Sequence, residues 1–212
     1  MKLIIWPALV TLAITLLRLA GERLEWSTTL FNPAAGGGGS PIGISWLPPF
    51  LGAYFAWKLA KGGEGPASPG KVIGVSLAGI AGIIALAVAA SVLGPLGPLV
   101  GGAVASIIAP VFVVRTWKAL GMTLFSYALA ARIPVAIIML IAISGQWGTH
   151  YDVLPPDAGP ELTAMGTLGR WFWIGLVPQM TFWVAFTILV GMLFGALTVL
   201  IAKPQPSNPA AP

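Results

Sequence analysis

The segment "THYD", residues 149–152, places a hydroxyl, an imidazole, a phenol and a carboxylate at consecutive positions. A carboxylate that orients an imidazole is the arrangement of a general base, and His150 with Asp152 could form one. No serine or cysteine nucleophile motif accompanies this pair. We therefore expect a loop held by structural hydrogen bonds, with a membrane-embedded enzyme as the alternative.

The sequence has few of the side chains that bind metals and redox cofactors. It has no cysteine, and His150 is its only histidine. These absences exclude protein-ligated iron–sulfur clusters, disulfides and zinc sites built from several histidines. We predict no cofactor and no metal site. The basic residues behind the net charge of +5 are scattered at the ends of apolar runs, which is typical of contact with anionic membrane surfaces and not of nucleic-acid binding.

Arg132 is the only charged residue between positions 125 and 145. If the membrane span begins near Leu120, Arg132 is central and needs a partner or a wet cavity. If the span begins near Ser126, its side chain reaches the inner membrane surface. Pro134 favours the first alternative, because a proline frees a carbonyl one turn earlier. We expect Arg132 to face the interior and to donate hydrogen bonds there, either to a bound anion or to the carbonyls that Pro48 and Pro49 free on a neighbouring span.

Three further polar residues are candidates for a site near the outer membrane boundary. Arg18 and Glu22 are four positions apart, so they share one helical face and are expected to form an exposed ion pair. Alternatively, the carboxylate lines an outer vestibule or pairs with another helix. Gln179 follows a proline near the same boundary and could meet the loop at 149–152.

The composition requires a membrane environment. Apolar residues make up 57% of the 212 residues and charged residues only 8%, against about 25% charged residues in soluble domains. Runs that cross hydrocarbon must be helical, because open backbone finds no partners there. We predict an all-α bundle of six transmembrane helices in one domain, residues 1–202, followed by a disordered proline-rich tail, 203–212. The runs are 3–20, 42–60, 72–93, 96–114, 120–145 and 180–201.

Prolines interrupt the second and fifth runs. Pro48 and Pro49 lie within the second run and Pro134 within the fifth, so both spans are expected to be kinked. Interrupted spans at matching positions of two halves are typical of inverted-repeat transporters. No residue-level repeat accompanies them, and a kink that serves packing is the alternative.

The basic residues predict the orientation, because cytoplasmic segments carry an excess of lysine and arginine. With the N-terminus inside, only Arg18, Arg23 and Arg170 lie in outer segments. The chain is then an integral protein of a bacterial cytoplasmic membrane with both termini in the cytoplasm. The basic residues of the inner segments are Lys2, Lys58, Lys61, Lys71, Arg115, Lys118 and Lys203.

Small residues four positions apart allow helices to approach closely. Gly191 and Gly195 form such a pair, which serves either internal packing or a homo-oligomer.

The broken spans and Arg132 favour a transporter or channel-like permease for a small solute or ion. The alternative is a non-catalytic scaffold or an accessory subunit of a membrane complex.

Overall fold

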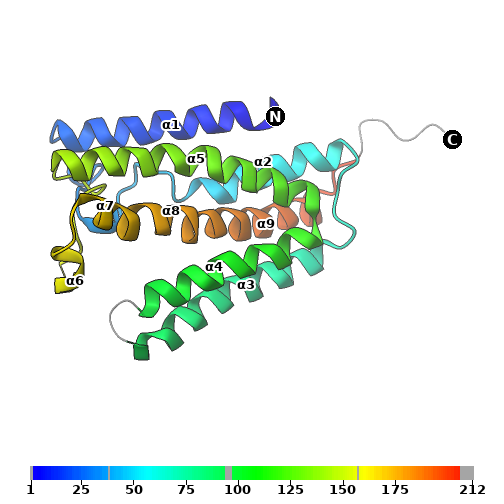
Figure 1. Ribbon diagram of the computed structural model, residues 1–212. Coiled ribbons are helices and arrows are strands. Elements are labelled where there is room, and N and C mark those ends of the chain that lie inside the picture. The colour runs from blue at the N-terminus through cyan, green and yellow to red at the C-terminus, as the bar shows by residue number, and fades with distance from the viewer. Residues whose placement is uncertain (1, 38, 94–96, 157, 206–212) are drawn as a thin grey trace. The chain divides into compact units, whose positions relative to one another are not determined.

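The computed structural model describes residues 2–37, 39–93, 97–156 and 158–205, and within them every regular element is a helix (Figure 1). The 3₁₀ turns are η1 (Ala35–Gly37) and η2 (Ala90–Leu93), and η3 (Trp171–Leu176) is a π-helix. The α-helices are α1 (Lys2–Arg23), α2 (Leu47–Lys61), α3 (Pro69–Ala89), α4 (Gly97–Thr116), α5 (Lys118–Gly145), α6 (Pro160–Thr163), α7 (Thr167–Arg170), α8 (Val177–Met180) and α9 (Phe182–Ala202).

In the described part of the chain, five helical segments are long and apolar enough to cross a membrane. A membrane span needs about 20 apolar residues, and these segments have between 20 and 36. The chain is therefore an integral membrane protein with an all-helical fold. The five segments are Lys2–Arg23, Pro69–Leu93, Gly97–Thr116, Lys118–Gly145 and Thr167–Ala202.

Helix α2 differs from the predicted second span. The sequence predicts a span from residue 42 with a kink in its middle. The helix instead begins at Leu47, and Pro48 and Pro49 lie in its first turn. A proline there costs no hydrogen bond, because the first amides of a helix have no partner within it. The prolines therefore start this helix and do not bend it, and α2 has only 15 residues.

The fifth and sixth runs are closer to expectation. Helix α5 is continuous over 28 residues with Pro134 inside it. Because α5 begins at Lys118, Arg132 lies about 21 Å along its axis, near the middle of the helix. The last run was predicted to begin at residue 180, and α9 begins at Phe182, just after the regular helix is interrupted at Thr181.

The chain forms two compact units. Unit 1 consists of Met1–Ile4, Trp46–Leu129 and Thr181–Pro212. Unit 2 consists of Ile5–Ser45 and Ala130–Met180. That residues 1–202 behave as one domain stays a prediction, and residues 206–212 of the predicted tail lie outside the described part.

Close helix packing in unit 1 depends on glycines. A Cβ on Gly52 of α2 would overlap the carbonyl oxygen of Gly191 of α9, and a Cβ on Gly195 would lie 2.9 Å from that of Ala56. Helices α2 and α9 are therefore parallel and in close contact. Gly191 and Gly195 thus serve packing inside the unit, the first of the two alternatives.

Unit 2 has its own apolar core. Val135, Met139 and Ala142 of α5 surround the buried ring of Tyr151. The indole nitrogen of Trp171 donates to the carbonyl oxygen of Ala136 at 2.8 Å. The loop after α5 is therefore packed against this helix.

Candidate functional site

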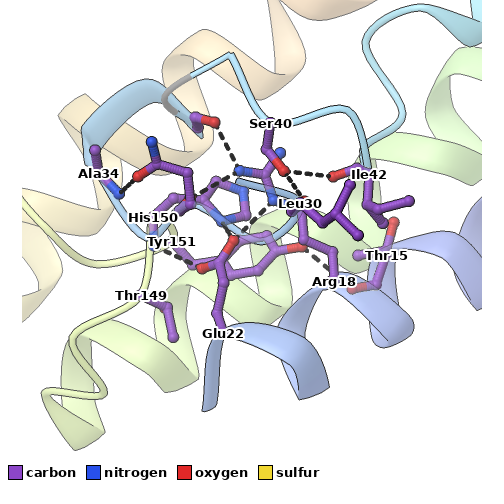
Figure 2. Close-up of polar contacts among 12 residues, drawn as sticks. Thr15, Arg18, Glu22, Leu30, Ala34, Ser40, Ile42, Thr149, His150 and Tyr151 are labelled. Atoms are coloured by element: carbon purple, nitrogen blue, oxygen red, sulfur yellow. Dashed lines mark hydrogen bonds and ion pairs between the residues drawn. The ribbon is translucent and has the colours of Figure 1, made fainter. Parts of the chain in front are cut away.

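Glu22, in the last turn of α1, is the centre of a buried ionic cluster (Figure 2). Its side chain has no exposed surface. Oε1 accepts from Arg18 Nε at 2.8 Å and lies 2.6 Å from His150 Nδ1. Oε2 accepts from the backbone nitrogen of His150 at 2.9 Å. One carboxylate thus joins α1 to the loop after α5. The predicted Arg18–Glu22 ion pair is present, but it is buried and not exposed.

Arg18 is held by the loop between α1 and α2. Its Nη2 donates to the carbonyl oxygens of Gly37 at 2.8 Å and Asn32 at 3.2 Å. A Cβ on Gly37 would lie 3.1 Å from Nη2, and one on Gly43 would lie 3.0 Å from Nη1. Gly37 also has a φ of 87°, which disfavours other residues. The glycine-rich loop therefore packs closely against the guanidinium of Arg18.

Asp152 does not orient His150, contrary to the hypothesis from the sequence. Its Oδ1 accepts from the backbone nitrogen and hydroxyl of Thr149 at 2.8 and 2.7 Å, and its Oδ2 accepts from the nitrogen of Gly148 at 2.9 Å. Aspartate side chains commonly bond backbone groups a few residues away. Asp152 therefore closes its own loop, and Glu22 takes the role of orienting carboxylate.

Tyr151 connects the cluster to the core of unit 2. Its hydroxyl donates to the carbonyl oxygen of Thr15 at 3.3 Å, and its ring centroid lies 3.8 Å from that of His150. Burial raises the pKa of the Tyr151 phenol well above its usual range, and the positive charges of Arg18 and Arg132 oppose this shift. Both guanidiniums therefore act electrostatically on the same phenol.

Arg132 is 4% exposed. This burial, with its position about 21 Å from the start of α5, agrees with the interior alternative and not with a side chain that reaches the membrane surface. Its bonds to a bound anion or to carbonyls near Pro48 and Pro49 stay predictions.

His150 has the geometry of a proton acceptor. Glu22 as a carboxylate only accepts hydrogen bonds, so the proton of the neutral imidazole lies on Nδ1. Burial lowers the pKa of His150 below 6.5, the hydrogen bond to Glu22 opposes this shift, and the charge of Arg18 adds to it. Within the described residues Nε2 forms no hydrogen bond, so this nitrogen can take up a proton.

Gln179 of α8 is also buried in unit 2. It is 8% exposed, and its amide nitrogen lies 3.7 Å from Met139 Sδ. Its Oε1 is buried without a hydrogen-bond partner among the residues described. Because Met139 packs against Tyr151, Gln179 is linked through α5 to the loop it was expected to meet.

Sequence reasoning missed the residues that complete the site: Gly37, Gly43 and Asn32. A run of glycines beside an asparagine is a signal for left-handed backbone, but it does not show which side chain the loop will contact.

Comparisons of the chain with protein-family models, with curated proteins and with solved structures found no match.

Proposed function

We propose that the protein is a permease for a small solute or ion, with six membrane crossings and both termini in the cytoplasm. The observation that carries the proposal is the burial of Arg18, Glu22 and Arg132 in a helical membrane protein. Ionisable groups in a membrane interior are costly, and they are typical of substrate and ion pathways.

The polar groups of unit 2 follow one another from the end of α1 into the interior. Glu22 bonds His150, the ring of His150 lies 3.8 Å from that of Tyr151, and Arg132 is a further buried cation of the same unit. Arg132 stands near the middle of α5 and is the only charged residue between positions 125 and 145. A sequence of polar groups that begins at a loop and continues to mid-membrane depth is what a pathway requires, whereas a scaffold needs only apolar contacts.

The contact between Glu22 and His150 supports six crossings. It places the C-terminal end of α1 beside the loop that follows α5, so both lie on one side of the membrane. Helices α3, α4 and α5 contribute three crossings between that loop and α2. Three crossings that started on the side where α1 ends would finish on the opposite side of the membrane. The loop after α5 can therefore lie on the same side as the end of α1 only if α2, with the segment before it, also crosses. The excess of basic residues in the remaining loops then favours cytoplasmic termini.

Reconstitution into lipid vesicles tests the proposal. Vesicles with wild-type protein are loaded with inorganic anions, inorganic cations or small organic solutes, and flux is compared with that of protein-free vesicles. We expect flux of one class above background. Arg132→Leu should abolish this flux, and Arg132→Lys should restore little of it, because an ammonium lacks the planar fork of a guanidinium. Lys118→Leu, at the exposed start of the same helix, is the matched control.

The accessory-subunit alternative has its own support in unit 1. Among the described residues of that unit, the buried polar side chains are only Ser76, Ser106 and Thr187. A unit with so apolar an interior is suited to packing against other membrane proteins. Absence of flux for every solute class, with the protein folded, would favour this alternative. Homo-oligomers also stay a prediction, and they would use a face other than that of Gly191 and Gly195, which α2 covers.

A further inference from the structure

An apolar groove runs between α3 and α4 in unit 1. It has a volume of about 500 Å³, and its lining includes Gly74, Ala78 and Gly82 of α3 and Ala105, Ile108 and Phe112 of α4. The two helices are antiparallel, since Gly79 lies beside Ala109 and Gly102 beside Ala87. Ile108 and Phe112 are 50% and 56% exposed, so the groove is open at the protein surface.

The groove is about as long as one leaflet of a membrane. Its α3 wall extends from Gly74 to Leu86, which corresponds to about 18 Å at 1.5 Å per residue. Half of the hydrocarbon core is about 15 Å. Both helices that form the groove belong to membrane-spanning segments. The groove therefore faces hydrocarbon, and one acyl chain matches its length and apolar lining.

One end of the groove is basic. Lys71 lies one helical turn before Gly74 on α3, and Arg115 lies one turn after Phe112 on α4. The Arg115 guanidinium is 5.9 Å from the centroid of the Phe112 ring, so it stands over the groove wall. Neither cation forms an ion pair with a carboxylate in the described part of the chain.

The surroundings strengthen this positive charge. Lys58 and Lys61 end α2, Lys118 begins α5 and Lys203 follows α9. The parallel packing of α2 with α9, and the bond from Trp117 Nε1 to the carbonyl oxygen of Glu64, bring these helix ends together. Glu64 is the only acidic residue of unit 1.

We propose that this groove binds an anionic phospholipid, with one acyl chain between α3 and α4 and the headgroup phosphate on Lys71 and Arg115. The charge at the mouth selects an anionic headgroup, and the apolar lining selects the chain. This site lies in unit 1, and it does not depend on the permease proposal.

Native mass spectrometry of the purified chain in detergent measures the binding. The probes are phosphatidylglycerol and phosphatidylcholine with the same acyl chains. Each basic residue near a membrane surface contributes about 1 kcal/mol, so two of them predict a preference for phosphatidylglycerol of roughly thirtyfold. Lys71→Gln with Arg115→Gln should remove this preference. Lys2→Gln, which removes an exposed cation at the start of α1, should retain it.

Filling the groove tests the acyl-chain half of the site. Gly74 and Gly82 line the groove, and a Cβ at either position meets nothing within 4 Å, so a leucine there starts in open space and occupies part of the groove. We expect Gly82→Leu to weaken phosphatidylglycerol binding at least about tenfold. Ala81→Leu adds the same side chain at an exposed position outside the lining and should leave binding unchanged.

Circular dichroism and thermal melting establish that each variant is folded, and Gly74→Leu repeats the test if Gly82→Leu is not. Equal binding of phosphatidylglycerol by Gly82→Leu and Ala81→Leu would overturn the groove as the site. Equal affinity of the wild-type chain for both lipids would overturn the role of Lys71 and Arg115.

Discussion

Replacing Glu22 by glutamine keeps the shape of the side chain and removes its charge. Both carboxylate oxygens accept hydrogen bonds, from Arg18 Nε, His150 Nδ1 and the His150 backbone nitrogen. An amide NH₂ in either orientation faces at least one of these donors. The Arg18 side chain, only 9% exposed, also loses its counter-ion. Removing one partner of a buried ion pair costs about 3–5 kcal/mol, and we expect Glu22→Gln to lower the free energy of unfolding by that amount.

Reversible unfolding in mixed micelles, followed by tryptophan fluorescence, measures this free energy. Glu25→Gln makes the same change at an exposed position three residues later and should stay within about 0.5 kcal/mol of wild type. Arg18→Gln combined with Glu22→Gln should recover part of the loss, because no uncompensated charge remains buried. If Glu22→Gln were as stable as Glu25→Gln, or if the two losses simply added, the cluster would not be the ionic core described above.

Three further changes have directions that follow from the structure. Burial lowers the pKa of His150, so the unfolded chain takes up this proton at a higher pH than the folded chain. The contribution of His150 to stability is therefore complete above about pH 6.5 and is lost as the pH falls through the folded pKa. The melting temperature should decline over this range, and His150→Asn should abolish the decline. Gly52→Ala should cost about 1–3 kcal/mol in the same unfolding assay, because its Cβ overlaps the Gly191 carbonyl, whereas Gly74→Ala, in open space, should cost nothing. Asp152→Ala removes three hydrogen bonds that close its loop and should increase cleavage of this loop by an added protease; unchanged cleavage would show that these bonds do not hold the loop closed.

Parts of the candidate site were predictable because they depend on local geometry. Arg18 and Glu22 are one helical turn apart, so any helix through them pairs them. For Arg132 the sequence left two alternatives, and the burial of its side chain agrees with the interior one. The partner of His150 was not predictable in this way. Glu22 is 128 positions away, and no periodicity relates the two, whereas Asp152 is near in sequence but bonds its own loop.

The sequence by itself determined that this is an all-helical membrane protein, because the length and apolarity of a span are properties of one contiguous segment. Only the tertiary structure decided that Pro48 and Pro49 begin a helix and that Gly191 packs against Gly52. It also decided that Glu22, and not Asp152, holds His150. In each case the sequence is compatible with more than one pairing of residues. The pairing that forms depends on which groups are buried next to each other when the helices pack, because a buried polar group must form a hydrogen bond with whatever group the fold places beside it.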